Sequence, residues 1–190
     1  MKIQELFIMS NQALQRVVSQ IDAEQWDLMM PEGTTREPST LRDAVRHHIY
    51  EDAWVPDVLA GKTIAEVGDK YEYLKTTEDI QADYTRYNQQ AIDAVRHFTD
   101  LNRITHLSYG DFSARDYLQH ILSFRAARSY DIARLIGADT TMASDFAEGL
   151  LEEYGPVADN YRKMGVFPPA LPVADDATPQ EKFLALIGRE

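Results

Sequence analysis

The chain has 190 residues, no cysteine and a formal net charge of −12, from 31 acidic and 19 basic side chains. The acidic excess argues against nucleic acid as a partner, because phosphate binding requires clustered Lys and Arg. The lack of cysteine excludes a cysteine nucleophile, thiolate metal ligands and disulfides. No apolar run suggests a signal segment or a membrane span. We therefore expect a cytoplasmic protein of one domain with an appended tail and no membrane partner.

Apolar residues at helical spacing predict four long amphipathic helices, over about residues 3–21, 39–61, 78–98 and 113–137. Ser39 is a good N-cap for the second helix, because its hydroxyl can accept a backbone N–H that has no partner within the helix. Gly61 stands where a left-handed residue would follow the end of that helix. Ser113 begins a capping-box-like start of the fourth helix, which we expect to end before Gly137.

The remaining segments are shorter. The stretch RITHLSYGD, residues 103–111, predicts an extended segment that is too isolated to form a sheet by itself. A fifth helical region is expected over about residues 144–164. A Pro-rich strap then precedes TPQE, residues 178–181, which is a complete start signal for a short C-terminal helix.

Together these elements predict an all-α fold, namely a four-helix bundle with long connections, a short extended segment and a small C-terminal helix. We expect residues 1–165 to form the bundle. Residues 166–190 would form the Pro-rich strap and the short helix, packed on the same domain.

Two adjacent histidines in the second predicted helix are the first candidates for chemistry. His47 and Glu51 are four residues apart, so their side chains share one face of a helix, as a metal-binding pair requires. Alternatively, Glu51 is a solvated charge and His47 a histidine of the core or its rim. His48 points about 100° away from His47, and the periodicity lets either histidine face the interior. His120 in the fourth helix is expected to pack or hydrogen-bond locally.

Four segments carry a resemblance that covers nearly the whole chain. They are IDAEQWDLMMPEGTTREPSTLRDAV, LRDAVRHHIYEDAWVPDVLAGKTIAEVGD, HLSYGDFSARDYLQHILSFRAARSYDIARLIGAD and VFPPALPVADDATPQEKFLALIGRE. In combination they resemble DinB-like metal-binding proteins. The branch they resemble most is the actinobacterial one related to mycothiol-dependent maleylpyruvate isomerase.

The resemblance implies a four-helix bundle with a divalent metal between its helices. The ligands would be a histidine on the second helix, matched here by His47, and a pair four residues apart on the fourth helix. That pair corresponds to Phe124 and Arg128, of which the first has no donor atom and the second stays protonated. We therefore expect this metal site to be degenerate. Arg128 would supply the local positive charge and pair with Asp131 or Glu51.

Two alternatives would allow the protein to have a metal site. If the register of the fourth helix is shifted by one turn, His120 joins His47. Otherwise Glu51, Asp52 or a carboxylate from a loop completes a different site. In either case the metal would be a divalent ion such as Zn²⁺ or Ni²⁺, whereas the degenerate site implies no cofactor.

Three functions follow from these readings. The first is a small-molecule-binding bundle in which Arg128, Asp131 and Glu51 surround a small anionic ligand, because a guanidinium fork suits a carboxylate. The alternative is a divalent-metal-dependent isomerase or transferase that uses a thiol cofactor of the mycothiol type. The third is an interaction protein that forms a homodimer. A competing interpretation is purely structural: Arg125 and Arg128 would form internal salt bridges and no ligand would bind.

Overall fold

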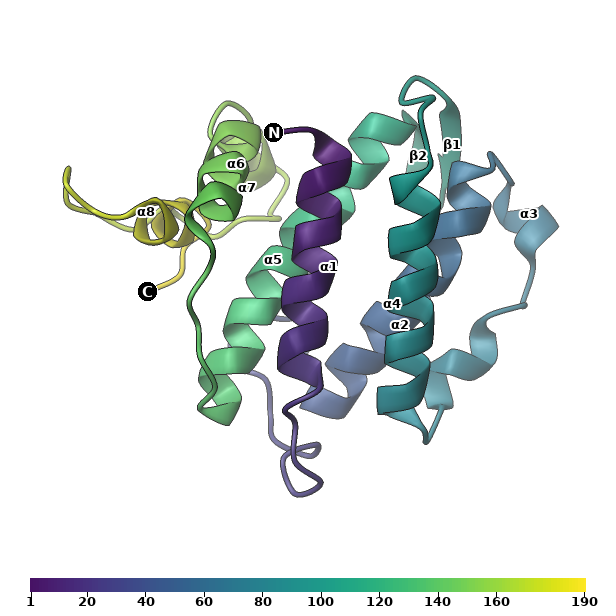
Figure 1. Cartoon of the computed structure of the whole chain (residues 1–190), viewed down its shortest axis with the longest axis horizontal. Coiled ribbons are helices and arrows are strands. Elements are labelled where there is room, and N and C mark those ends of the chain that lie inside the picture. Colours follow the sequence, from purple (N-terminus) through teal and green to yellow (C-terminus); the bar gives the residue numbers. More distant parts are fainter. The chain divides into compact units, whose positions relative to one another are not determined.

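The computed structural model describes all 190 residues, and the chain divides into two compact units. One unit is Lys2–Ala138, and the other is Asp139–Glu190 with Met1. Both are built from helices, and the single sheet has two short strands (Figure 1). The all-α class is therefore confirmed, while the domain ranges 1–165 and 166–190 stay a prediction.

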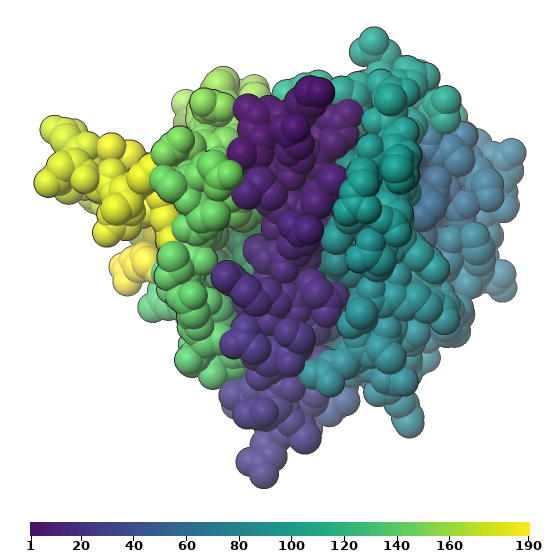
Figure 2. Space-filling model, in the orientation of Figure 1, coloured from purple at the N-terminus to yellow at the C-terminus, as the bar shows by residue number.

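Four long helices form the first unit: α1 (Ile3–Val18), α2 (Leu41–Leu59), α4 (Ile80–Arg96) and α5 (Ala114–Ile136). Helix α1 lies between α5 and α4, and α2 packs on the other side of α4 (Figure 1). Side chains fill the spaces between the α1 and α4 ribbons (Figure 2). Helices α2 and α5 have much less direct contact with each other than the other neighbouring pairs.

Apolar side chains hold α1, α2 and α4 together. Leu14, Val45, Ile49 and Tyr84 are completely buried in one cluster, which Ile132 of α5 also joins. Leu14, Val45, Ile49 and Tyr84 lie on the helical stripes that their sequence spacing predicts. Burial of such side chains is the main stabilising contribution to a bundle of this kind.

The ends of the helices follow their local chemistry. Ser113 caps α5 as predicted, since its hydroxyl accepts a hydrogen bond from the Asp116 backbone N–H at 3.1 Å. Gly137 ends α5 with a φ of +72°, which a residue without Cβ adopts at little cost. The prediction of Ser39 as the α2 cap was wrong. Thr40 is the cap, because the Ser39 carbonyl is already bonded to the Met30 N–H.

The connections contain further short elements. A turn of helix, α3 (Ile64–Val67), and a 3₁₀ turn, η1 (Glu72–Thr76), join α2 to α4. Strands β1 (Ile104–Leu107) and β2 (Gly110–Ser113) form an antiparallel hairpin between α4 and α5. The segment is extended as predicted, and it forms a two-stranded sheet that gains support by packing on both α2 and α5. That it is too isolated to form a sheet by itself stays a prediction.

The second unit contains α6 (Ser144–Tyr154), α7 (Ala158–Lys163) and α8 (Pro179–Leu186). The break between α6 and α7 lies in the helical region that the sequence predicts. Thr178 and Glu181 form the expected capping box at the start of α8. None of the helices in the structure has the length and apolar character that crossing a membrane requires.

Candidate functional site

A fully buried ion pair joins α5 to α2 where these helices face each other. Arg125 of α5 has no exposed surface, and Asp52 of α2 is 1% exposed. The Arg125 Nη2 and Nε atoms donate to Asp52 Oδ1 at 2.5 and 3.1 Å. The Nη1 atom donates to the Ile121 carbonyl oxygen at 3.0 Å. The guanidinium is thus held by an acidic side chain opposite and by its own helix.

The Asp52 carboxylate also connects the other two helices. Asn11 of α1 donates its amide N–H to Oδ1 at 3.3 Å, and Asn88 of α4 donates to Oδ2 at 3.4 Å. Asn88 also contacts the hydroxyl of Tyr84 at 3.1 Å. Burial alone disfavours the charge of Arg125, but the carboxylates of Asp52 and Glu51 outweigh it and keep the pKa of the guanidinium above its ordinary value. This polar cluster therefore links all four long helices.

A second acidic side chain, Glu51, lies beside this cluster. Its Oε1 is 3.3 Å from Nε2 of His47, and its Oε2 is 3.5 Å from Nδ1 of His48 and 3.9 Å from Nη1 of Arg125. The Oε2 atom is buried and makes no hydrogen bond of ordinary geometry. Burial favours the protonated acid, but His47 and His48 outweigh it and hold the pKa of Glu51 well below its usual value. Glu51 is therefore ionised at neutral pH.

The two histidines differ sharply in environment. The side chain of His48 is 2% exposed, and burial lowers its pKa to about 4. The side chain of His47 is 66% exposed, and its hydrogen bond to Glu51 raises its pKa. The histidine that faces the interior is therefore His48, and it is neutral at physiological pH.

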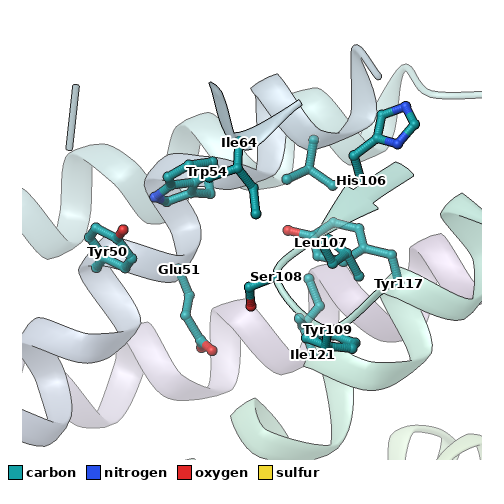
Figure 3. Close-up of a pocket in the computed structure, with 11 residues that line it drawn as sticks. Tyr50, Glu51, Trp54, Ile64, His106, Leu107, Ser108, Tyr109, Tyr117 and Ile121 are labelled. Carbon is teal, nitrogen blue, oxygen red and sulfur yellow. The ribbon is translucent and has the colours of Figure 1, made fainter. Parts of the chain in front are cut away.

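A cavity of about 240 Å³ opens next to Glu51. Helix α2 forms one side of it and α5 another, and the turn of the hairpin lies between them (Figure 3). Its walls are largely aromatic and aliphatic, and Glu51 is the one carboxylate among them. The lining residues are Tyr50, Glu51, Trp54, Val58, Ile64, His106, Leu107, Ser108, Tyr109, Tyr117 and Ile121.

The phenol groups of this cavity are uncharged at neutral pH. Burial raises the pKa of Tyr109 to about 12 and raises the pKa of Tyr117 as well. The hydroxyl of Tyr50 donates to Glu72 at 2.9 Å, outside the cavity. The imidazole of His106 is 2.8 Å from the Asp111 carboxylate. Within the cavity wall, the fixed charge is therefore that of Glu51.

The side chains implied as metal ligands do not form a metal site. No three histidine, aspartate or glutamate side chains are placed to hold a metal ion together. His47 is bound to Glu51 near the surface, and Phe124 is 46% exposed and has no donor atom. The ring of His120 packs on Phe112, with centroids 4.9 Å apart, and its Nδ1 is 3.3 Å from the Tyr109 hydroxyl. The residues present do not fit a divalent metal.

Arg128 lies about one turn, and Asp131 nearly two turns, further along α5 than Arg125. Asp131 is buried, and Arg128 is partly buried. Neither side chain lines the cavity. The charge of Arg128 contributes to lowering the pKa of His48, after the larger effect of burial. An anion site at Arg128 with Asp131 and Glu51 stays a prediction.

Sequence reasoning missed the pairing of Arg125 with Asp52 and the role of the hairpin turn. A signal for the pair was available, because Asp52 lies on the same helical stripe as the buried residues Leu41 and Val45. A carboxylate on such a stripe requires a buried cationic or hydrogen-bonding partner. Tyr109 had no such signal, since only the hairpin geometry brings it beside α2 and α5.

No family model, no curated protein and no solved structure matches this chain. The geometry of the cavity and of the adjoining ion cluster is therefore the basis for a functional proposal.

Proposed function

We propose that Lys2–Ala138 is a DinB-like bundle that binds a small organic molecule in the cavity between α2, α5 and the hairpin, without a metal. The observation that carries this proposal is the cavity itself, which combines aromatic walls with a single ionised carboxylate. Ligand sites are typically concave and mostly apolar, with a few polar groups that fix the orientation of the ligand.

The size of the cavity limits the ligand. A volume of about 240 Å³ lies just below the range of pockets for drug-sized compounds. We therefore expect a ligand with one ring and a short substituent. The aromatic side chains Tyr50, Trp54, Tyr109 and Tyr117 line the cavity, and such side chains pack well against a ring.

The buried ion pair supports binding without a metal. In the bundle that the sequence resembles, a divalent ion would supply positive charge between the second and fourth long helices. Here the guanidinium of Arg125 lies between Asp52 and Glu51, at 2.5 and 3.9 Å from their carboxylates. A divalent cation at this place would be repelled by that charge.

The proposal also includes a cytoplasmic location, which rests on the lack of cysteine.

A screen of single-ring compounds by ligand-observed NMR tests the proposal. Leu107 of β1 lines the cavity, so Leu107→Trp should fill it and abolish the signals of the compounds that bind there. Ile104 lies on the same strand, is 53% exposed and does not line the cavity. Ile104→Trp is therefore the matched control and should leave binding unchanged. If no compound binds the wild type, or if both variants bind equally well, the proposal is wrong.

A further inference from the structure

We infer that the ligand of this cavity is an organic cation, a protonated amine or a quaternary ammonium compound, with Glu51 as its counter-ion and aromatic rings around its charged group. This inference rests on the proposed function and names the ligand class for the same cavity. It also reverses the sign of charge expected from the sequence, which pointed to an anion at Arg128.

The first argument is the position of the Glu51 carboxylate. Glu51 extends from α2 toward the cavity, where Ser108 and Tyr109 of the hairpin turn lie opposite (Figure 3). Its Oε2 atom is buried and lacks a hydrogen bond of ordinary geometry. Its nearest donor groups are Nδ1 of His48 at 3.5 Å and Nη1 of Arg125 at 3.9 Å. An N–H donor from a ligand would give the carboxylate a closer, charge-assisted hydrogen bond.

The second argument is that the groups around Glu51 keep it ionised but give its Oε2 atom no hydrogen bond of ordinary geometry. The Nε and Nη2 atoms of Arg125 donate to Asp52, and Nη1 donates to the Ile121 carbonyl oxygen. Its contact with Glu51 is longer, at 3.9 Å. His48 is neutral because burial lowers its pKa to about 4. His47 contacts the other oxygen, Oε1, and is mostly exposed to solvent, which screens its charge.

The third argument is the aromatic wall. Tyr50, Trp54, Tyr109 and Tyr117 line the same cavity as Glu51. Aromatic faces carry partial negative charge and attract cations, as in the aromatic cages that bind quaternary ammonium groups. The raised pKa values of Tyr109 and Tyr117 keep both phenols neutral. An anion would meet both the ring faces and the Glu51 charge, and both would repel it.

The net charge of the whole chain acts in the same direction. At −12, it attracts cations toward the protein at low ionic strength and disfavours anions. The effect is not specific to the cavity, so binding of a cationic ligand should weaken with salt partly for this reason.

Three probes of similar shape test the sign of the charge: 2-phenylethylammonium, 2-phenylethanol and 3-phenylpropanoate. Their dissociation constants for the full chain are measured by calorimetry at pH 7.5. We expect the ammonium compound to bind about tenfold more tightly than the alcohol, and the carboxylate to bind most weakly. Glu51→Gln should reduce the preference for the cation over the alcohol to about twofold or less. A circular-dichroism melt of each variant reports on folding.

A second variant keeps the test decisive if Glu51→Gln does not fold. Tyr109 lies at the hairpin turn and is 59% exposed, so Tyr109→Leu should be tolerated by the bundle. This change should weaken the ammonium compound more than the alcohol, whereas Tyr109→Phe should retain the preference because the ring remains.

The outcomes separate this inference from the proposed function. Equal binding of the three probes, or tighter binding of the carboxylate, overturns the cation inference and leaves a binding cavity. The same holds if none of the three binds while other compounds bind in a manner that Leu107→Trp abolishes. If nothing binds in either experiment, both the inference and the proposed function are wrong.

Discussion

Helix α2 joins its two neighbours in opposite ways. In its contact with α4, Val45, Ile49 and Tyr84 are fully buried and make an apolar interface. In its contact with α5, Asp52 and Arg125 are equally buried but interact through charge and hydrogen bonds. Apolar packing tolerates a change of partner, whereas a buried charge requires its specific partner. The comparison suggests that the α2–α4 interface provides stability and that the α2–α5 interface fixes geometry beside the cavity.

Asp52→Ala should have the largest effect on stability. It leaves the guanidinium of Arg125 buried without its main partner, which costs about 3–5 kcal/mol of the free energy of unfolding. The double variant Asp52→Leu/Arg125→Met removes both charges and should recover most of this loss, because an apolar replacement of a buried pair is often neutral. Urea denaturation of Asp52→Leu, Arg125→Met and the double variant gives the coupling energy. A loss below about 1 kcal/mol for Asp52→Ala would contradict the proposed difference between the two interfaces.

Ile49→Ala probes the apolar interface in the same way. The side chain is fully buried, so its truncation should cost about 2–4 kcal/mol through lost burial and the cavity that remains. Unlike the effect of changes near the ion pair, this cost should be the same at pH 5 and pH 7.5 and at low and high salt. Urea denaturation under the four conditions checks this. A strong dependence on pH would show that the α2–α4 and α2–α5 interfaces are energetically coupled.

His48 should make the α2–α5 side sensitive to pH. Its pKa falls from 6.5 to about 4 on folding because it is buried. The unfolded chain therefore binds a proton at this histidine more readily than the folded chain does. The stability that depends on neutral His48 is fully present above pH 6.5 and is lost as the pH falls toward 4. Between pH 7.5 and 5 the loss is about 2 kcal/mol.

Removing the buried imidazole tests this prediction. His48→Leu should flatten the fall in stability between pH 7.5 and 5, since the ring of His48 loses only a 3.5 Å contact with Glu51 and no hydrogen bond of ordinary geometry. His47→Gln is the control. Because the pKa of His47 is raised on folding, its removal should leave the slope unchanged or make it steeper. An unchanged slope in His48→Leu would mean that other groups cause the pH dependence.

The smallest predicted effect concerns the start of α2, which both interfaces share. Thr40→Ala should cost about 1 kcal/mol, because it removes the hydroxyl that accepts the Asp43 N–H. Ser39→Ala, one residue earlier, should change stability by less than about 0.5 kcal/mol. Thermal melts of both variants measure the difference. A larger effect for Ser39→Ala would favour the cap predicted from the sequence.

The sequence was sufficient for features that depend on local chemistry. The four long helices follow from apolar spacing, and the ends of α5 follow from Ser113 and Gly137. The α2 cap was misplaced by one residue because a backbone bond between Met30 and Ser39 competes with it. Local pattern does not contain such long-range bonds.

The candidate site was only partly predictable, because its groups come from distant segments. Glu51 was identified from its spacing to His47, and the two side chains do contact each other. The partner of Arg125 required knowledge of which faces of α2 and α5 meet. The cavity also depends on the hairpin, whose support by both helices is a tertiary effect. Spacing within one helix identifies neighbours on that helix and not those across the bundle.

The hairpin has a consequence for how this fold can diversify. It is the one part of the cavity wall that is not helical, and its turn residues Ser108 and Tyr109 are exposed. Insertions at such a turn are well tolerated because few buried contacts depend on its length. Loop exchange at this position, in evolution or in the laboratory, can therefore reshape the cavity, and with it the selectivity of the proposed binding site, while the helical scaffold keeps its sequence.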